Sequence, residues 1–530
     1  MKFLTRSLII LLLLYGLLFA IGDLYMARNG VPLWGAIIFA VIFIGLQYLL
    51  SPHVIEWTLA IHWDEFKSEL PVKNWEFIEK LCADRGLKVP RIGVIHSGTP
   101  NAFCFGRVPG DARLVVTTGL LEVLTPEETN AVLAHEIGHI EHWDFVVMTI
   151  AALVPLLLYQ IYAFADRINN SRAVGYAAYA CYLLSQFMVL LLNRSREYFA
   201  DHYSAEVTHA PDQLSSALVK IAYGMVRADG EYKKALQDKD TKSEARRNRR
   251  LAGSMAVMGI SNLHSGAALA LAGADPASAS SVMRWDLVNP WARFYELNST
   301  HPLTALRVRA LNEQAETMHQ VAKYPLPSDN RIRWGTFPLE LVIWATPWVS
   351  IVLLGIVFWA PELITYFGLT IPEHMKPILL IIAGATGILR TWYRYHGEFQ
   401  PATVGTLIED VEVSQMRPRA VQLKGQIVGR GVPGAFWSSD LVLRDSTGIL
   451  FVLYRQSIPL ARLMFAITEA ESYIGQEVEI EGWFRRGLSP YVEMSLLKGE
   501  NGESHRAYSR WIQYGLGVLA IIAGYYWLQM

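Results

Sequence analysis

Long apolar stretches alternate with polar segments along this chain. Seven stretches have the character of membrane-crossing helices, because a hydrocarbon core of about 30 Å needs roughly 20 apolar residues per helix. They cover residues 7–22, 33–50, 146–165, 176–192, 339–360, 377–389 and 511–528. We therefore expect a polytopic membrane protein with an N-terminal hairpin (1–50), a pair of spans (about 146–165 and 176–192), a second hairpin (336–395) and a last helix (511–528).

The first apolar stretch has about the length of a signal-peptide core. Lys2 and Arg6 precede it, as basic residues precede such a core. No convincing cleavage site follows near Ile21, and a second apolar stretch comes at once. We interpret residues 7–22 as an uncleaved membrane anchor.

Basic residues gather on one side of the predicted spans. Lys2 and Arg6 precede the first span, and Arg194 and Arg196 follow the fourth. Arg331 and Arg333 precede the fifth span, and Arg390 and Arg394 follow the sixth. Loops rich in Lys and Arg stay in the cytoplasm. The opposite loop holds Arg167 and Arg172, which weakens this asymmetry slightly. The pattern predicts a multi-pass protein of the cell (inner or plasma) membrane, with the polar segment after the second span on the cytoplasmic side.

Two polar regions have the patterns of folded domains. In the first, residues 74–86 predict a helix, and residues 91–96 and 113–117 are rich in Val and Ile and predict strands. In the second, alternating stretches between glycine-containing turns predict strands at 421–428, 440–443, 449–454, 477–484 and 491–495, with a helix at 458–471. This order is typical of a small OB-like barrel. The aromatic and basic surface needed for nucleic acid is weak, so we interpret it as a module at the membrane surface for a protein partner or for substrate handling.

The composition agrees with a membrane protein and narrows its partners. Of the 530 residues, 52% are hydrophobic, and the mean hydropathy is +0.24. The formal net charge of −1 gives no sign of a nucleic-acid partner. Cys82, Cys104 and Cys181 are scattered, so we expect no disulfide framework, and the polar domains suit a reducing cytosol.

An HExxH box occupies residues 135–139. Its two histidines, His135 and His139, are four residues apart, so both imidazoles leave one face of a helix and can bind one metal ion. Glu136 lies beside them, in position to take a proton from a metal-bound water. If one more residue of the protein binds the metal, three of its four coordination positions are filled and the fourth stays open. An open fourth position is typical of a catalytic zinc site.

The residues before the box predict a well-defined helix start. Thr125 can cap the helix, Pro126 suits its first position, and Glu128 can close a capping box. Residues 129–141 contain no proline and only one glycine, and they include several apolar residues. The box is therefore expected on a helix.

The third protein ligand has to come from another part of the chain. A metzincin would need HExxHxxGxxH, but His142 and Phe145 occupy its glycine and third histidine positions. Glu197, just after the fourth apolar stretch, is the expected ligand. We interpret His142 as a helix-end residue near the membrane surface.

Other polar residues near Glu197 have weaker claims on the site. His202 and His209 follow it on the same helix, and we interpret both as bystanders. Arg194 and Arg196 suit two roles equally well, as anchors of a helix that leaves the bilayer and as residues of the site.

Four motifs, in order, resemble those of one known family. They are Pro100-Asn101-Ala102-Phe103, the stretch from Gly119 to Asp144 with the HExxH box, the Arg196–Asp201 segment, and Ser299-Thr300-His301-Pro302 with Arg307. The chain resembles the membrane-bound M48 metallopeptidases, which include the heat-shock protease HtpX and the CAAX prenyl proteases. The similarity runs from about Asn74 to Leu311 and does not explain the rest of the chain.

The resemblance implies a metal centre. His135, His139 and Glu197 would bind one Zn²⁺ per chain, and Glu136 would be the general base and later the proton donor. The residue types alone do not distinguish zinc from iron or manganese, because two histidines and a carboxylate can bind those ions as well.

The resemblance also implies supporting residues. Asp201 would orient a ligand histidine through its free ring nitrogen, and Arg307 would support the site through an ion pair whose partner the sequence does not identify. His301 would stabilise the oxyanion. Asn101 and Ala102 would pair with the substrate backbone as an edge strand pairs with an added strand.

These features predict an α-helical polytopic membrane protein with a zincin-type (gluzincin) α+β peptidase domain at 51–335 and a small, mostly β, OB-like domain at 400–500. The expected function is that of a zinc endopeptidase acting on misfolded or damaged membrane proteins. Two alternatives stay open: a CAAX-type prenyl-peptide protease, and a non-catalytic membrane scaffold with a structural zinc site. Glu136 argues against the scaffold, because a structural site needs no base and usually has four protein ligands.

Overall fold

The computed structural model of the chain describes most of its residues. The described residues are 33–59, 61–64, 67–165, 172–221, 276–326, 331–359, 372, 374–430, 439–456, 459–487, 490–500 and 502–530. The predicted span at 7–22 lies outside them. The chain divides into an N-terminal unit, Met1–Met283 with Phe294–Leu326, and a C-terminal unit, Arg284–Arg293 with Pro327–Met530.

A four-stranded sheet forms one side of the core in the N-terminal unit. Its strands lie in the order β1 (His62–Trp63), β2 (Arg91–Ile95), β4 (Arg113–Thr117) and β3 (Ala102–Phe105). The strands β2 and β4 are parallel, whereas β3 pairs with β4 antiparallel and forms the edge. The predicted strands at 91–96 and 113–117 agree with β2 and β4, and the predicted helix at 74–86 agrees with α3 (Val72–Asp84).

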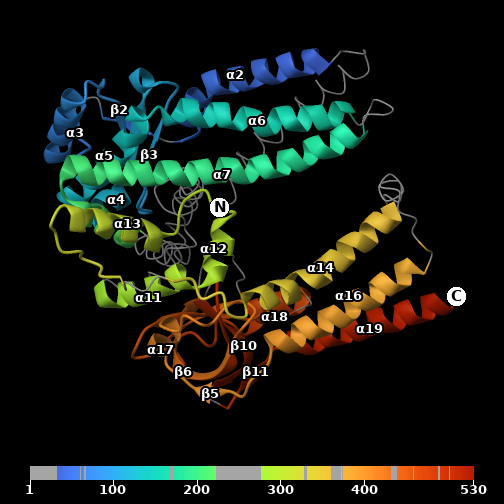
Figure 1. Cartoon of the computed structure of the whole chain (residues 1–530). Helices are drawn as coiled ribbons and strands as arrows, with labels where there is room; N and C mark the ends of the chain where they lie inside the picture. Colours follow the sequence, from blue (N-terminus) through green and yellow to red (C-terminus); the bar gives the residue numbers. More distant parts are fainter. Residues whose placement is uncertain are drawn as a thin grey trace. The chain divides into compact units, whose positions relative to one another are not determined.

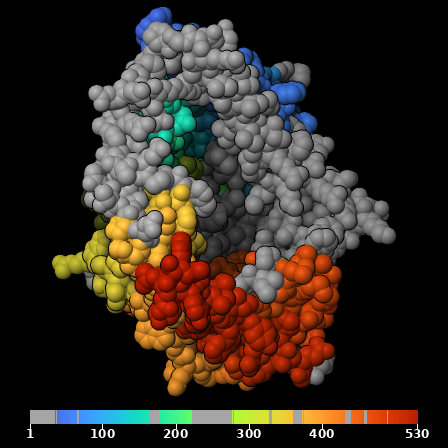
Figure 2. Space-filling view, turned by 90° about the vertical axis from the view of Figure 1, so that its right-hand side faces the viewer, coloured from blue at the N-terminus to red at the C-terminus, as the bar shows by residue number. Residues whose placement is uncertain are grey.

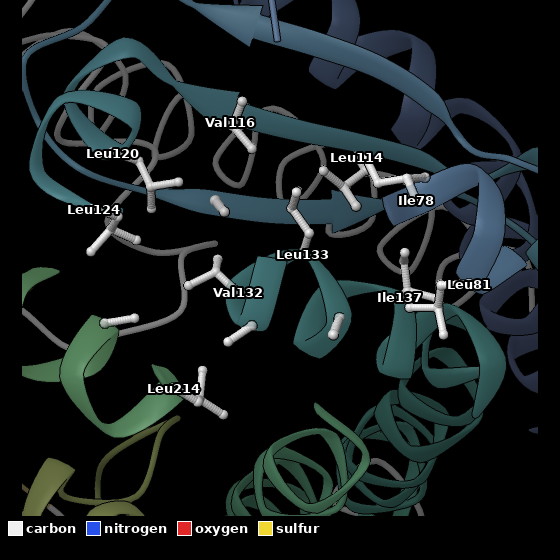
Figure 3. Packing of buried hydrophobic residues seen from close by; sticks show 14 of the residues in the cluster. Ile78, Leu81, Leu114, Val116, Leu120, Leu124, Val132, Leu133, Ile137 and Leu214 are labelled. Carbon is white, nitrogen blue, oxygen red and sulfur yellow. The ribbon is translucent and has the colours of Figure 1, made fainter. Parts of the chain in front are cut away.

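The helix α5 (Pro126–Glu141) packs against this sheet and is buried on nearly all sides (Figure 3). Thr125 and Glu128 form the predicted capping box at its start. The residues of α5 without exposed surface are Ala131, Val132, Leu133, Ala134, His135 and Ile137.

The helix α7 (Arg172–Thr208) is continuous from the predicted fourth span into the core. It packs on α5 at Gly138, where an added Cβ would lie 3.0 Å from the Tyr203 ring and 3.4 Å from the Ala200 Cα. The glycine lets the two helices approach closely. The helix α13 (Thr304–Thr317) packs on α7, and α11 (Pro276–Val288) and α12 (Pro290–Glu296) precede it in the chain.

Among the described residues, five helices are long and apolar enough to cross a membrane. They are α2 (Leu33–Thr58), α6 (Asp144–Ala165), α14 (Phe337–Trp359), α16 (Met375–Arg394) and α19 (Ser509–Gln529). Each corresponds to one of the predicted spans. The predicted span at 176–192 lies on α7, which is not among these five, and it stays a prediction. In the N-terminal unit, α6 packs beside α2 and α7 (Figure 1).

In the C-terminal unit, α16 packs against both α14 and α19 (Figures 1 and 2). An added Cβ at Gly384 of α16 would lie only 2.6 Å from the Gly517 carbonyl oxygen of α19. Small residues at such crossings are typical of helices that pack within a bilayer. The segment 284–293 also belongs to this unit, where the Trp285 indole donates to the Val413 carbonyl at 2.7 Å.

A closed five-stranded barrel follows α16. Its strands are β6 (Arg419–Arg430), β7 (Leu441–Arg444), β8 (Ile449–Leu453), β9 (Glu477–Arg486) and β10 (Pro490–Gly499). They pair in the order β6-β7-β8-β10-β9 and back to β6, and β8 and β10 run parallel. The helix α18 (Pro459–Thr468) follows the third strand. The small β domain is confirmed, and the helix position agrees with the predicted OB-like order.

Candidate metal centre

Two histidines of α5 and a glutamate of α7 converge in the core of the N-terminal unit. One ligand atom from each of His135, His139 and Glu197 lies within 4.8 Å of the other two, and all three residues are buried. The two histidine Nε2 atoms are 3.2 Å apart, and the rings are nearly perpendicular at 87°. The close packing at Gly138 brings α7, and with it Glu197, to the histidines.

The spacing of these donors fits a zinc ion. The two Nε2 atoms are 3.2 Å apart, His135 Nε2 lies 3.7 Å from Glu197 Oε2, and His139 Nε2 lies 3.7 Å from Glu197 Oε1. Ligands about 2.0–2.1 Å from a tetrahedral Zn²⁺ are separated by roughly 3.3–3.4 Å. Two imidazoles and a carboxylate are also a known ligand set of catalytic zinc. His135, His139 and Glu197 therefore fit zinc in both chemistry and spacing.

Asp201 and Arg307 form a buried pair behind His135. The Asp201 Oδ1 lies 3.0 Å from His135 Nδ1, the ring nitrogen that faces away from the metal position. Arg307, from α13, donates to both Asp201 oxygens at 2.6 and 2.8 Å and lies 3.5 Å from Glu197. The structure thus identifies the ion-pair partner of Arg307 that the sequence left open.

Asp144 has the corresponding position behind His139, and the sequence analysis missed it. His139 Nδ1 donates to Asp144 Oδ2 at 2.5 Å, and Arg196 lies 2.9 Å from the same oxygen. The available signal was a carboxylate at the first position of an apolar helix, five residues after a candidate ligand. A buried charge there needs a partner. Arg196 was expected either to anchor a helix that leaves the bilayer or to belong to the site. Its contact with Asp144 supports the role in the site.

His301 lies in the loop before α13 and also approaches the cluster. Its Nδ1 is 3.2 Å from Glu197 Oε2. Residues at the end of the predicted fourth span hold this loop: Asn193 donates to the Thr300 carbonyl at 2.7 Å, and Arg194 donates to the Ser299 carbonyl at 3.0 Å. Arg194 therefore supports the loop that carries His301.

Glu136 lies beside the edge strand β3. It is 3% exposed, and the Cys104 thiol of β3 is its neighbour: burial and the Glu136 carboxylate raise the pKa of that thiol well above its ordinary value. No sequence motif indicated that Cys104 belongs to the site. Asn101 and Ala102 are buried at the start of the same strand, where Thr117 N donates to the Asn101 carbonyl at 3.0 Å.

Charge compensation keeps two carboxylates of the site ionised. Burial would raise the pKa of Glu197, but His301 and Arg307 together with His139 hold it well below its ordinary value. Burial also opposes ionisation of Asp201, and Arg307 keeps its pKa below the ordinary value. Glu197 and Asp201 are therefore available as anionic groups beside the two histidines.

The three histidines judged to be outside the site do not join it. His142 is the C-cap residue of α5, as predicted, and its ring packs against Tyr203 at 5.8 Å between centroids. His202 is exposed, and its carbonyl accepts from Gln314 at 3.1 Å. His209 ends α7 with a φ of 51°.

The chain matches a known sequence family over this region. The profile of Peptidase family M48 matches residues 75–315. This range agrees with the similarity expected from about Asn74 to Leu311.

Several proteins named as HtpX proteases are similar to the same region. A Protease HtpX homolog of Methanothermobacter thermautotrophicus is 39% identical over 225 residues, which cover 42% of this chain and 86% of that protein. A Protease HtpX homolog of Moorella thermoacetica is 37% identical over 223 residues, covering 40% and 73%. The crystal structure of S. mikatae Ste24p aligns with 58% of this chain and 67% of its own chain, with 18% identity and a TM-score of 0.32.

Proposed function

The chain belongs to peptidase family M48 and is a metallopeptidase of a membrane, and we propose that it is an endopeptidase acting on misfolded or damaged membrane proteins. The observation that carries this proposal is the buried cluster of His135, His139 and Glu197 with Glu136 beside it. The apolar helix α6 begins at Asp144, five residues after His139. A polypeptide that leaves the bilayer would meet the site there.

Glu136 is the proposed proton carrier of the reaction. The two histidines and Glu197 would hold zinc, which would lower the pKa of a bound water molecule toward about 7. Glu136 takes the proton from this water and later gives it to the leaving amine. Its buried position beside Cys104 keeps bulk water away from that proton.

The edge of β3 that pairs with no described strand, here called the free edge, is the proposed binding surface for the substrate backbone. In an antiparallel pair, residues alternate between those bonded to the partner strand and those directed away from it. Asn101 is bonded toward β4, so the backbone groups of Ala102 and Cys104 are directed to the free edge. A substrate strand added there would lie along Cys104, next to Glu136. This placement supports a substrate-binding role for the Asn101–Ala102 segment.

His301 is the proposed stabiliser of the oxyanion. A donor aimed at the developing negative charge can contribute a factor of about 10² to 10³ in rate. His301 is held close to Glu197 by its loop, and Asn193 and Arg194 fix that loop. We also propose that the site is on the cytoplasmic side of the cell membrane, as the basic residues next to the spans predict.

Substrate choice can be tested on the reconstituted protein. Wild type and Glu136→Gln would each receive a destabilised membrane protein, soluble casein and a farnesylated peptide. The proposal expects internal cleavage of the membrane protein by wild type and no cleavage by the variant. Cleavage confined to the farnesylated peptide would overturn the proposed substrate class and favour a CAAX-type protease.

Asp144→Asn is expected to weaken zinc binding about 10- to 100-fold. The substitution keeps the shape of the side chain but removes the charge that His139 and Arg196 share. Competition with a chelator would measure the affinity. Glu127→Gln, at an exposed position of α5, is the matched control and should bind zinc like wild type. Equal affinity in both variants would contradict the role of Asp144.

Zinc affinity is expected to fall as the pH is lowered through the pKa of His139. Burial lowers this pKa, but the hydrogen bond to Asp144 and the charge of Glu197 raise it above its ordinary value in the metal-free protein. A proton and zinc compete for the imidazole, so affinity should fall about tenfold per pH unit below that pKa and level off above it. Glu197 and Asp201 stay ionised in this window because their pKa values are lowered. Zinc titrations from about pH 5.5 to 8.5 would measure the slope, and a flat profile would contradict it.

A further inference from the structure

A row of apolar side chains on α18 faces away from the barrel. Leu460, Leu463, Met464 and Ile467 have exposed fractions of 65%, 37%, 53% and 51%. Residues three and four apart lie on the same face of a helix. These four residues, the α18 stripe, therefore form one continuous apolar surface along this helix of 10 residues.

The opposite face of α18 is fixed to the barrel. Phe465 is only 2% exposed, and its ring lies 4.3 Å from the Tyr454 ring and 4.4 Å from the His505 ring between centroids. The Arg430 side chain also donates to the Ala466 carbonyl. The helix cannot turn its stripe inward without losing this packing. An exposed apolar surface of this kind marks an interaction site.

The first turn of α19 lies next to α18. Met464 and Phe465 of α18 line one hollow together with Tyr508 and Ile512 from the start of α19. The Tyr508 amide also donates to the Gln456 side chain at 3.2 Å, in the segment that leads from β8 toward α18. Since α19 is long and apolar enough to cross a membrane, α18 lies beside the end at which α19 would enter a bilayer.

Exposed aromatic residues mark the same level on two membrane helices. Tyr508 and Trp511 at the start of α19 are 54% and 60% exposed, and Trp392 at the end of α16 is 59% exposed. Trp and Tyr are enriched where a membrane helix crosses the lipid–water boundary. Arg510 lies over the Trp511 ring at 4.8 Å, and Arg462 is an exposed cation on α18 itself. The exposed Arg462 can reach lipid phosphates.

We propose that α18 is an interfacial helix whose stripe is inserted into the boundary between lipid headgroups and acyl chains. The occupant of the stripe is the bilayer that α19 crosses, because the stripe is continuous with the aromatic entry point of that helix. An apolar row combined with nearby basic residues is what interfacial helices use. The barrel is thereby held on the lipid surface by a third contact besides α16 and α19. This inference goes beyond the proposed peptidase function and does not depend on it.

Spin labels on the full chain in nanodiscs of phosphatidylcholine and phosphatidylglycerol test this proposal. The background is Cys104→Ser with Cys181→Ser, since Cys82 is buried. Labels are placed on the stripe by Met464→Cys and, separately, Ile467→Cys. The background protein without a new cysteine shows how much spin-label signal comes from nonspecific labelling, and this signal is subtracted. Thermal unfolding checks that each labelled chain is folded.

Two further positions serve as references. Leu519→Cys, on an exposed position of α19, reports the bilayer interior, and Glu409→Cys reports water. Glu409 follows α17 (Val404–Ile408), on the other side of the barrel from α18 (Figure 1). Oxygen, which concentrates in lipid, and a water-soluble nickel chelate would be used as relaxation agents for each label.

Both stripe labels are expected to be more accessible to oxygen than to the nickel chelate, with values between those of Leu519→Cys and Glu409→Cys. Values equal to those of Glu409→Cys would overturn the proposal, because the stripe would then face water. Low accessibility of the stripe labels to both oxygen and the nickel chelate would also overturn the proposal, since protein rather than lipid would then cover the stripe.

Discussion

Glu136→Gln is expected to lower the rate of peptide cleavage by about 10²- to 10⁴-fold, the usual contribution of a general acid–base group. Glutamine has nearly the same shape as glutamate but cannot take up the proton of the attacking water. His135, His139 and Glu197 are untouched, so their converging donors should still hold zinc. The measurement is the cleavage rate of a membrane-protein substrate by purified wild type and variant, with metal content determined on the same samples.

Metal content separates two explanations of a lost rate in this variant. Loss of activity with about one zinc per chain would place the defect in proton transfer. Loss of both activity and zinc would mean that Glu136 supports the metal centre instead. Cleavage at the wild-type rate would contradict the assignment of Glu136 as the base.

Arg307→Met is expected to reduce the free energy of unfolding by about 3–5 kcal/mol, because it leaves buried carboxylates without their counter-charge. Arg307 is 1% exposed and donates twice to Asp201, which in turn faces His135. The guanidinium also lowers the pKa of Asp201 and contributes to the low pKa of Glu197. Without it, both pKa values should rise in the folded state, so the variant should gain less stability than wild type as the pH is raised through the range where carboxylates titrate. Thermal unfolding in detergent at several pH values would measure both effects.

A neighbouring arginine on the same helix provides the control. Arg309 pairs with Glu313 at 3.8 Å and is about one-third exposed. Surface ion pairs of this kind contribute about 0–1 kcal/mol. Arg309→Met should therefore leave the unfolding temperature nearly unchanged. Equal unfolding temperatures for the two variants would contradict the role of the Arg307–Asp201 pair.

Local sequence signals predicted many helices and strands of this structure, because interactions between residues that are close in the sequence determine these elements. Thr125 and Glu128 form a capping box that needs only neighbouring residues. The strands and helix of residues 400–500 follow an alternating pattern interrupted by turns, and their order was sufficient to suggest the barrel. The same holds for the apolar runs, whose length alone identifies five described helices as candidate spans.

Contacts between segments that are distant in the sequence could not be predicted from local patterns. The pairing of Arg307 with Asp201 joins α13 to α7 across 106 positions, and no periodicity connects them. Asp144 resembled the first residue of a membrane helix, and only folding shows that its carboxylate faces His139. Cys104 had no motif at all, since its place beside Glu136 follows from the register of β3 on β4.

The central claim is that His135, His139 and Glu197 hold the one metal ion on which peptide cleavage depends. The most direct test compares zinc content and cleavage in wild type, Glu197→Ala and Glu206→Ala, a matched variant at an exposed position of the same helix. We expect about one zinc per chain with cleavage in wild type and Glu206→Ala, and neither in Glu197→Ala. Full zinc content in Glu197→Ala, or cleavage by zinc-free wild type, would contradict the claim.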